Sequence, residues 1–545
     1  MEESIPIGVV IAAEGVTVKF RVNEGVYAER GQLLKVIDGE KTFIVRVYDP
    51  EPVSLLAPAE VARLSLKKSC GEQVELMDKQ LRVYNAAKAV IVAEVNGRGE
   101  VHGPSTVPSM FSEVYTLSKG DLKLLCLDGG DLEVGFVRSG HVVTSQKVSL
   151  SGRDVFPHHM LVCSATGGGK TNFCKVLAAS VLKCCDNAYS LIIIDTEGEY
   201  FDGGSQGAYG LAHLPQAEEK LFYVSQRVKE LRDFYYTFSW NGRFVKRRVK
   251  ACPLEVWLGL LKPEDFRQTG FFTPPQEALL WIAYREFGRS WLSMLMDWDI
   301  DEVYRELGGK AQKSTIAVVK RKLKMFVGDE TVFKRSDCKV DLIAEVLNAV
   351  KDGKVVLIDM PMATEAQEAL LTVLIARRVF EAYERAKKFS PEWWSKLPTV
   401  LIVVEEAHRY LSKRMLSEGE SNVFAEISKR GRKYRVGLCC ITQMPSELNE
   451  MVLRQQLTKV VLPLPTKADY TAIVSHSPYL DDAENEIKTL DRGEALLVSP
   501  PSGLKFAVPV KIHKFEELVE EELALEESMK AFQAVSYTHL TLPTN

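Results

Sequence analysis

Long hydrophobic runs are missing from this 545-residue chain. No apolar stretch reaches the ~18 residues that a membrane-spanning helix needs. The first residues, MEESIPIGVV, have no basic segment ahead of an apolar one, as a secretory signal would. We therefore expect no membrane partner and a cytoplasmic location.

An excess of charge of one sign is missing as well. Lys and Arg together number 69 and Asp and Glu 73, which gives a formal net charge of -4. This balance exerts no long-range attraction on nucleic acid or anionic lipid. Any contact with DNA must therefore come from a local basic patch.

Cysteines at metal-binding spacing are absent. The ten cysteines occur singly or as the neighbours Cys184-Cys185 and Cys439-Cys440, and never as C-x-x-C. The sequence thus has neither a zinc spacing nor a disulfide framework. Because most cysteines lie in apolar runs such as VGLCCITQ, we expect reduced, buried thiols that act as small hydrophobic side chains.

The pattern of the chain changes near residue 150. Before it, short alternating segments such as GVVIAAEGVTVKFRV are separated by Gly and Asp, which favours a small β-barrel. After it, apolar strands such as SLIIID and TVLIVVEE alternate with helical segments, as in a parallel α/β sheet. We predict an α/β fold with an N-terminal barrel over residues 1–150 and an α/β domain over residues 151–534. The second domain contains a helical insertion at about residues 250–350.

The last residues differ from the acidic helical stretch that precedes them. VSYTHLTLPTN, residues 535–545, looks like the translation of an adapter used in sequencing libraries. We expect this segment to be non-native and exclude it from the fold prediction.

SATGGGKT, Ser164–Thr171, lies between an apolar strand and a helical segment, which is the context of a phosphate-binding P-loop. Backbone N–H groups would face the phosphates from a helix N-terminus. Lys170 would reach the β and γ oxygens, and Thr171 would bind Mg²⁺. We therefore predict ATP and Mg²⁺ as cofactors. The predicted nucleotide-binding residues are Ala165, Thr166, Gly167, Gly168, Gly169, Lys170, Thr171 and Asn172.

Ser164 stands where the P-loop pattern G-x-x-x-x-G-K-[ST] begins with glycine. That first glycine mainly allows a tight turn out of the strand, whereas later amides hold the phosphates. Three glycines, at positions 167–169, remain where those amides lie. We therefore predict that nucleotide binding survives the serine.

Three apolar strands end in acidic residues, at Asp195, at Asp359 and at the pair Glu405-Glu406. Only the pair supplies two adjacent carboxylates, one for Mg²⁺ and one to polarise the attacking water. We assign Glu405 to the metal and Glu406 to the base. Asp195 stays open as a ligand in the metal shell or a support for the P-loop. Asp359 is better explained as a strand-end acid solvated in a loop.

The strand after this pair ends in ITQMPSEL and is preceded by SKRGRKYR. Gln443, at the carboxyl edge of the sheet, suits a sensor that bonds to the γ-phosphate or to water. Arg430 and Arg432 are of the residue type that neutralises transition-state charge, often from a neighbouring subunit. A basic run taken alone is more often a solvated face.

These segments in this order resemble the HerA family of hexameric DNA-translocating ATPases, in the FtsK-like branch of P-loop proteins. The similarity lies in the N-terminal barrel pattern and in HHMLVCSATGGGKTN, LIIIDTEGEY, VVEEAHRYL and SKRGRKYRVGLCCITQMPSEL. The resemblance implies a RecA-like ATPase core, a homohexameric ring with ATP sites between subunits, and double-stranded DNA in the pore. It also implies Glu406 as the catalytic glutamate, Gln443 as the sensor and Arg430 as the arginine finger, with Arg432 close behind.

The same resemblance implies that a NurA-like nuclease, or another effector, docks on the barrel during the processing of DNA ends. The chain departs from the family pattern at Ser164 and at two further positions. His158 stands where arginine is common, which puts a contact of that arginine with the nucleotide of its own subunit in doubt. Met444 stands where arginine is frequent, which removes one possible coupling residue.

FYYTFSWNGRFVKRRVK, Phe234–Lys250, is predicted to form a hairpin because Asn241-Gly242 favours a type I′ turn. Its basic residues could contact phosphates next to the aromatic side chains. Each basic cluster taken alone is more easily explained as a solvated face, but a ring repeats weak contacts. The basic residues are Arg243, Lys246, Arg247, Arg248 and Lys250 in the hairpin, then Lys320, Arg321, Lys322 and Lys324, and finally Lys413 and Arg414.

The leading prediction is an ATP-driven translocase or helicase on double-stranded DNA. Two alternatives stay open: an ATPase of the conjugation or secretion type, and a nucleotide-gated scaffold with little turnover. Strong stimulation of ATP hydrolysis by linear duplex DNA would distinguish the first from the other two.

Overall fold

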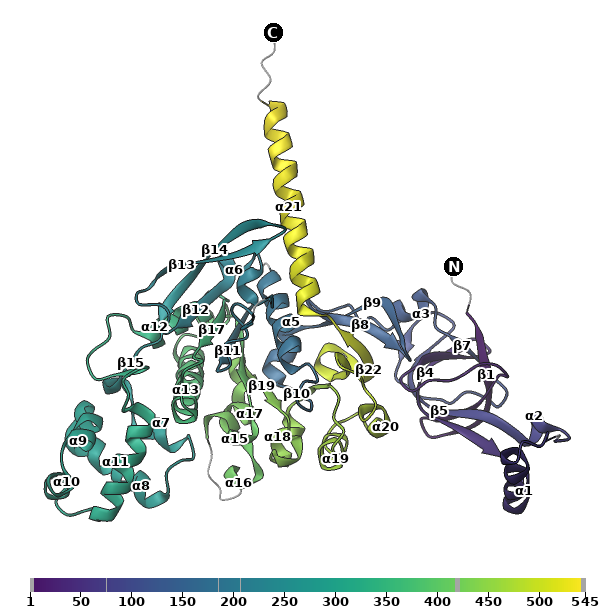
Figure 1. Ribbon diagram of the computed structural model, residues 1–545, viewed down its shortest axis with the longest axis horizontal. Helices are drawn as coiled ribbons and strands as arrows, with labels where there is room; N and C mark the ends of the chain where they lie inside the picture. Colours follow the sequence, from purple (N-terminus) through teal and green to yellow (C-terminus); the bar gives the residue numbers. More distant parts are fainter. Residues whose placement is uncertain (1–3, 75, 185, 206, 417–421, 541–545) are drawn as a thin grey trace, which may run out of the picture. The chain divides into compact units, whose positions relative to one another are not determined.

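The computed structural model describes residues 4–540, apart from positions 75, 185, 206 and 417–421 (Figure 1). The chain divides into two compact units. Unit 1 comprises residues 1–130, 135–149 and 463–512, and unit 2 comprises residues 131–134, 150–462 and 513–545. Each unit is thus built from three separate segments of the chain. The domain boundaries at residues 150 and 534 stay predictions.

Within the described part of unit 1, six antiparallel strands close into a barrel. Each strand pairs with two neighbours, in the cyclic order β1-β2-β5-β4-β3-β7. The strands are β1 (Pro6–Glu14), β2 (Thr17–Val22), β3 (Leu33–Asp38), β4 (Lys41–Ser54), β5 (Val83–Val95) and β7 (Glu113–Thr116). Side chains alternate along each strand, so that Val10, Phe20, Val36, Phe43 and Val45 form a buried core. The predicted N-terminal β-barrel is confirmed.

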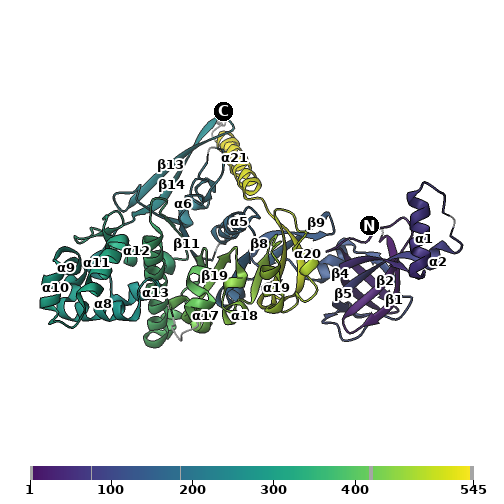
Figure 2. The same cartoon turned by 60° about the horizontal axis from the view of Figure 1, so that its bottom comes forward.

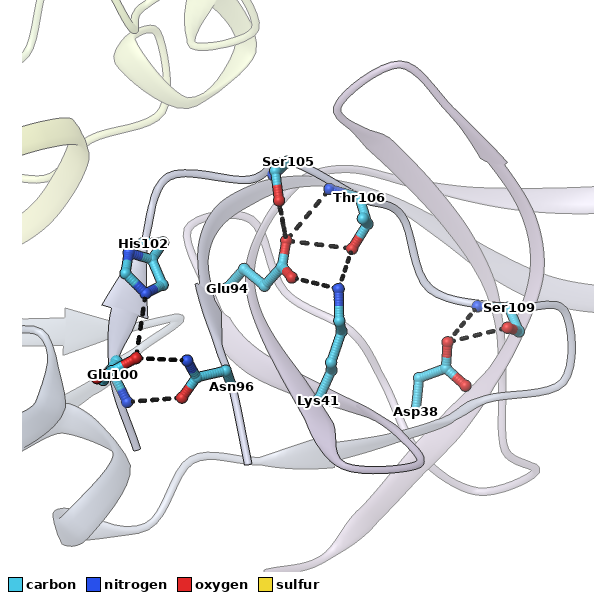
Figure 3. Close-up of polar contacts among 9 residues, drawn as sticks. All are labelled: Asp38, Lys41, Glu94, Asn96, Glu100, His102, Ser105, Thr106 and Ser109. Atoms are coloured by element: carbon cyan, nitrogen blue, oxygen red, sulfur yellow. Dashed lines mark hydrogen bonds and ion pairs between the residues drawn. The ribbon is translucent and has the colours of Figure 1, made fainter. Parts of the chain in front are cut away.

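A buried carboxylate fastens the loop after β6 (Val101–His102) to this barrel (Figure 3). Glu94, on β5, accepts a hydrogen bond of 2.7 Å from Lys41 Nζ. It also accepts bonds of 3.0 to 3.1 Å from the N–H and hydroxyl groups of Ser105 and Thr106. The bond from Lys41, aided by those of the loop, lowers the pKa of Glu94 to about 2. The carboxylate therefore stays ionised at neutral pH.

A second buried carboxylate joins residues 463–512 to the barrel inside unit 1. Glu486, in helix α20 (Glu484–Ile487), pairs with Arg46 of β4 and lies 3.0 Å from Arg138. Burying a charge is costly unless it is paired, and two guanidinium groups surround this one. The other elements here are β8 (Leu132–Ser139), β9 (Val142–Leu150), β21 (Glu494–Ser499), β22 (Leu504–Ile512), α1 (Pro58–Ser69), α2 (Lys79–Arg82), α3 (Lys119–Leu124) and α19 (Lys467–Ser475).

Unit 2 is built on a mostly parallel sheet (Figure 2). Its strands run in the order β13-β14-β12-β17-β11-β18-β19-β10-β20, and among them β13 and β14 form the antiparallel pair. The strands are β10 (Met160–Cys163), β11 (Tyr189–Asp195), β12 (Leu221–Ser225), β13 (Arg232–Trp240), β14 (Arg243–Pro253), β17 (Val355–Asp359), β18 (Thr399–Val404), β19 (Val436–Thr442) and β20 (Thr458–Val461). Every residue of β10, β11, β17, β18 and β19 is buried, which explains their continuous apolar sequences. The predicted α/β class is confirmed.

Helices complete unit 2. Those beside the sheet are α4 (Gly152–Val155), α5 (Lys170–Lys183), α6 (Ala217–Lys220), α12 (Leu342–Lys351), α13 (Glu365–Phe389), α14 (Pro391–Trp394), α15 (His408–Leu411), α16 (Lys413–Leu416), α17 (Val423–Tyr434) and α18 (Glu450–Gln455). A further group packs around the aromatic rings of Phe266, Phe272, Trp291 and Phe326. It comprises α7 (Pro263–Arg267), α8 (Pro274–Phe287), α9 (Trp291–Asp297), α10 (Ile300–Glu306) and α11 (Lys313–Val327). This group accounts for the helical periodicity between residues 250 and 350.

The last helix, α21 (Phe515–Leu540), runs into the segment that we expect to be non-native. Residues 535–540 continue the helix, and residues 541–545 lie outside the described part of the chain. The adapter origin of this segment stays a prediction.

Two expectations from composition can be compared with the described residues. No helix in that part of the chain combines the length and the apolar character needed to cross a membrane. The cysteines described are free thiols, of which Cys163, Cys174, Cys252, Cys439 and Cys440 are buried and Cys70 and Cys126 are exposed.

Candidate nucleotide-binding site

The loop between β10 and α5 has the backbone of a phosphate-binding loop. Gly167 and Gly169 have φ angles of 75° and 112°, which glycine adopts readily. Helix α5 begins at Lys170, so its first N–H groups are open to an anion beside the loop. Lys170 Nζ donates to the carbonyls of Ser164 at 3.1 Å and Ala165 at 3.3 Å. Its ammonium therefore lies against the loop that would hold the phosphates.

Ser164 forms the floor of this loop. Its side chain is fully buried, and Oγ donates to the carbonyl of Ala165 at 2.9 Å. A Cβ atom added to Gly168 would lie 1.9 Å from that Oγ. The loop accommodates the serine because position 168 has no side chain.

A chain of hydrogen bonds joins the P-loop to the ends of two neighbouring strands. Thr166 Oγ1 donates to Gln443 Oε1 at 2.6 Å, and Gln443 Nε2 donates to Glu406 Oε1 at 3.0 Å. His408 Nδ1 lies 3.3 Å from Glu406 Oε2 and 3.3 Å from Thr442 Oγ1. Since β18 and β19 are parallel neighbours, their carboxyl ends bring the predicted base and sensor together. Our sequence interpretation assigned no role to His408, although the E-E-A-H spacing puts it two residues after the base.

The backbone of Glu406 is strained. Its φ angle is 45°, in the left-handed region that residues other than glycine seldom adopt. The turn is held by the N–H of Ala407, which donates to the carbonyl of Ile441 at 2.9 Å. Strain of this kind persists only where the surrounding structure imposes it, and here it directs the Glu406 side chain to Gln443.

Glu405 makes a different contact from its neighbour. Its Oε1 accepts a hydrogen bond of 2.8 Å from the hydroxyl of Tyr200. Burial raises the pKa of Glu405 to about 7, and the bond from Tyr200 opposes the shift. A bound cation would favour the ionised form.

Asp195 organises the loop that carries Tyr200. Its Oδ1 accepts from the N–H groups of Glu197 at 3.2 Å and Gly198 at 2.8 Å, and its Oδ2 accepts from the N–H of Tyr200 at 2.8 Å. Burial raises the pKa of Asp195 to about 6 although these bonds oppose it. Both oxygens are thus engaged by the chain's own loop, which makes Asp195 an indirect support for Glu405.

The interpretation of Asp359 as a solvated loop residue is wrong. Asp359 is 1% exposed, and its Oδ2 accepts from the hydroxyls of Tyr223 at 2.5 Å and Ser225 at 3.2 Å. Both partners come from β12, which pairs with β17. The apolar strands on each side of β17 bury Asp359. Its position at the end of a strand does not by itself indicate this burial.

Arg430 and Arg432 lie at the opposite edge of the sheet from the P-loop. Both are in α17, which leads into the amino end of β19, whereas Gln443 follows its carboxyl end. Seven residues of strand separate these ends, which is about 20 Å at 3.3 Å per residue. An arginine at this edge cannot reach the P-loop of its own subunit.

The two arginines differ in their contacts. Arg430 pairs with Glu426 and with Glu384 at 2.6 Å, and it donates to the hydroxyl of Tyr434 at 3.1 Å. Arg432 is exposed, and its guanidinium has no ion pair among the described residues. Arg432 is therefore the one that is free to bind an external anion.

Both arginines line a cavity of about 880 Å³ at the amino ends of the strands. His158 lines it too, so an arginine at position 158 would face this edge and not the nucleotide of its own subunit. The cavity also collects Arg153, Lys387, Lys396, Lys429, Lys433 and Arg435, against Asp154 and Asp186. It is strongly basic.

Asn172, the last residue of the predicted nucleotide-binding set, faces the C-terminal segment. Its Nδ2 donates to the carbonyl of His513 at 2.8 Å, and its Oδ1 accepts from the N–H of Phe515 at 2.9 Å. The neighbouring Thr171 is the second residue of α5. The amide of Asn172 therefore connects the first turn of α5 to the start of α21.

The set of donors around the P-loop suits a magnesium nucleotide. No group of three or more His, Cys, Asp or Glu side chains is gathered for a metal within the described ranges. Mg²⁺ usually takes one or two protein oxygens and completes its shell with phosphate and water. The Thr171 hydroxyl and the Glu405 carboxylate are ligands of that kind.

Comparison with known proteins finds one matching family model and several similar proteins. Residues 133–379 match the model for the central domain of the helicase HerA. The DNA double-strand break repair helicase HerA of Saccharolobus solfataricus is 24% identical over 455 residues, which cover 82% of this chain and 80% of that protein. The protein of the same description from Pyrococcus furiosus is 24% identical over 476 residues, which cover 78% of each.

Among solved structures, the plasmid coupling protein TrwB in complex with ADP and Mg²⁺ has a TM-score of 0.45 at 14% identity, over 73% of this chain and 93% of that one. The matched domain contains the P-loop and Asp195, and the longer similarity to the two helicases extends beyond it. The resemblance to the HerA family is confirmed, and the chain is a P-loop ATPase whose residues 133–379 match the HerA central domain.

Proposed function

We propose that the protein hydrolyses ATP to move along double-stranded DNA as a homohexameric ring. The division of the catalytic groups between two edges of one sheet carries this proposal. The P-loop, Glu406 and Gln443 meet at the carboxyl edge, while Arg430 and Arg432 lie at the amino edge. A complete site therefore needs a second copy of the chain. DNA as the substrate is supported by the similarity to proteins described as DNA double-strand break repair helicases.

In the proposed site, the amides of residues 165–171 bind the phosphates and Lys170 turns from the loop carbonyls to the β and γ oxygens. Thr171 and Glu405 would hold Mg²⁺, which neutralises phosphate charge when it is bound. Tyr200 positions Glu405 through its hydroxyl. Asp195 acts one step further away, through the loop that carries Tyr200.

Glu406 would orient the attacking water and accept its proton. Gln443 would sense the nucleotide, a role supported by the hydrogen bonds of its amide to the Thr166 hydroxyl and to Glu406. A phosphate that draws Thr166 away would leave Gln443 free to turn toward the γ-phosphate. ATP binding and the activation of the attacking water would thereby be coupled through one chain of hydrogen bonds.

We assign the arginine finger to Arg432, acting on the nucleotide of a neighbouring subunit. Arg430, which the family resemblance favours, is neutralised by Glu384 and Glu426 and serves to position α17. An effector such as a NurA-like nuclease would dock on the barrel for the processing of DNA ends, and the cytoplasm is the proposed location.

The test is hydrolysis of ATP by the chain with and without linear duplex DNA, beside Lys170→Ala and Glu406→Gln. Strong stimulation by DNA that both substitutions abolish would support the motor. Tight ATP binding without turnover would overturn it in favour of a nucleotide-gated scaffold.

Mixing two inactive variants tests the shared site. Arg432→Ala and Glu406→Gln should each be inactive alone, whereas an equal mixture should regain about a quarter of the functional interfaces in a cyclic assembly. Recovery requires that one copy supplies Arg432 and another supplies Glu406. A mixture as inactive as its components, in an assembly shown to exchange subunits, would contradict a site formed between copies.

A further inference from the structure

The β13–β14 hairpin separates its charged residues onto two faces. The hairpin predicted from Asn241-Gly242 is confirmed, with φ angles of 48° and 74° at the turn. Tyr235 is opposite Arg248 in the register, and Thr237 is opposite Lys246. Because side chains alternate along a strand, the basic residues divide into two sets. Lys246, Arg248 and Lys250 share the outer face, and Arg243 and Arg247 share the inner one.

The inner cations are neutralised by acidic residues of α21. Arg247 is 3% exposed and donates to Glu526 Oε1 at 3.0 Å. Arg243 Nη1 lies 3.0 Å from Glu527 Oε1. Both views show the hairpin and α21 side by side (Figures 1 and 2). The inner face is thus covered by α21 at Arg247, while Arg243, nearer the turn, is exposed but paired with Glu527.

The outer cations have no comparable partners. The Arg248 guanidinium lies 3.9 Å from Asp233 Oδ2, and Glu218 Oε1 accepts a hydrogen bond of 3.3 Å from the backbone N–H of Arg248, not from its guanidinium. Lys246 lies 4.2 Å from the ring centroid of Tyr235. Among the residues that the structure describes, neither Lys246 nor Lys250 forms an ion pair. The charge of this face is available to an external anion.

Two aromatic side chains on the same face are exposed. Phe244 is 85% exposed and Tyr235 is 55% exposed. Large apolar rings exposed to water often mark a binding surface. Surfaces that bind nucleic acid combine such rings, which contact sugars and bases, with cations that contact phosphates.

The basic cluster of α11 fits this role less well. In α11, Lys320 Nζ donates to the carbonyl of Trp298. Lys322 Nζ donates to the carbonyl of Phe271 at 2.6 Å and to Gln276 Oε1 at 2.7 Å. These amines stabilise the helical group of residues 263–327.

We infer that the outer face of the hairpin, formed by Lys246, Arg248, Lys250, Tyr235 and Phe244, contacts the backbone of duplex DNA. This inference rests on the proposed function and names the surface through which that function would act. Alternate residues of a strand lie about 6.8 Å apart, a spacing on the scale of successive phosphates in one DNA strand. A two-stranded ribbon also fits the major groove, and binding to phosphates would carry no sequence preference.

The experiment measures binding of the full chain to a labelled linear duplex between 50 and 200 mM salt, a range over which neutralising about six phosphates changes affinity ~10³-fold. The test variant is Lys246→Gln/Arg248→Gln/Lys250→Gln. Its matched control is Arg243→Gln, on the same strand but on the inner face. We expect the triple variant to lower the slope of log K against log salt by roughly 0.9 for each phosphate that the protein no longer neutralises, while the control keeps the wild-type slope.

Two further measurements separate the parts of the inference. ATP hydrolysis without DNA should be unchanged in the triple variant, while stimulation by duplex DNA should be abolished. Phe244→Ala should weaken binding roughly tenfold without changing the salt slope, because an aromatic ring releases no counterions when it binds. Lys246→Glu alone should lower the salt slope and the stimulation by duplex DNA in the same direction as the triple variant. It replaces the triple variant if that variant does not fold.

The outcomes distinguish this inference from the proposed function. If the wild-type chain neither binds duplex DNA nor is stimulated by it, the proposed function fails. If the wild-type chain binds and the triple variant keeps the wild-type slope and stimulation, only the hairpin surface is overturned. If the triple variant no longer binds a single-stranded oligonucleotide of the same length but still binds the duplex, the choice of duplex DNA is overturned.

Discussion

Gln443 donates a hydrogen bond of 3.0 Å from its Nε2 to Oε1 of Glu406. The side chain predicted to sense the nucleotide therefore holds the side chain predicted to activate water. The Gln443 Oε1 atom accepts a hydrogen bond of 2.6 Å from Thr166 of the P-loop. The same amide therefore contacts both the P-loop and Glu406.

Replacing Gln443 should separate ATP binding from turnover. We expect Gln443→Ala to lower kcat by about 10²-fold, because Glu406 loses its orientation toward the attacking water. The Kd for ATP should change less than about threefold. Steady-state hydrolysis and nucleotide titration give the two values, with Met444→Ala as the adjacent control. Equal losses in kcat and in affinity would contradict a sensing role.

The two arginines of α17 should respond differently to substitution. Arg432→Ala should reduce kcat by about 10³-fold if the arginine acts as a finger, without changing the Tm, because the guanidinium has no ion pair in the described chain. Arg430→Ala should lower stability by about 1 kcal/mol, since Glu384 and Glu426 lose their shared partner. Thermal unfolding and hydrolysis measured on both variants test this division. A lowered Tm in the Arg432 variant alone would reverse it.

The clash between positions 164 and 168 predicts a rescue. Gly168→Ala places a Cβ 1.9 Å from Ser164 Oγ and should cost about 1 to 3 kcal/mol, with weaker ATP binding. Adding Ser164→Gly removes the hydroxyl and should restore most of the stability and affinity. Denaturant unfolding and nucleotide titration of the two single variants and the double variant form the cycle. Additive effects would show that Ser164 is not the obstacle.

The barrel should lose stability in acid through Glu94. Its pKa is lowered to about 2 from an ordinary value of 4.5, so its contribution to stability is complete above about pH 4.5 and is lost as the pH falls toward 2. Glu94→Gln should destabilise the chain by about 2 kcal/mol at pH 7, and by less at pH 3. Urea unfolding at both values tests this, with the exposed Glu14→Gln as the control. A difference that does not shrink in acid would exclude the carboxylate charge as its source.

The carboxyl edge of the site could be predicted from the sequence because each part follows a buried strand. Parallel strands end at the same edge, so that Thr166, Glu406 and Gln443 had to be neighbours. Their hydrogen-bond partners could not be predicted, since rotamers and the strained φ of Glu406 depend on packing around the turn. The engagement of both Asp195 oxygens by its own loop has no sequence signal that we recognise.

Other features depended on segments that are distant in the sequence. Strand alternation alone assigns Arg243 and Arg247 to one face of the hairpin, but only the position of α21, nearly 300 residues later, makes that face the inner one. The sequence does not predict the burial of Asp359, because the strand that covers it, β12, lies far away in the sequence. Local pattern defined the elements, and tertiary packing decided which of their polar groups are free.

The two edges of the unit 2 sheet also restrict how copies can assemble. In the proposed assembly, each subunit would give Arg432 from one edge and receive an arginine at the other, so that it has a donor end and an acceptor end about 20 Å of strand apart. One two-fold contact cannot satisfy both ends, since such a contact pairs a surface with itself. Head-to-tail association either closes into a circle or grows as an open filament. Every closed circle then has a direction, and a polymer threaded through it meets the same face of every subunit first.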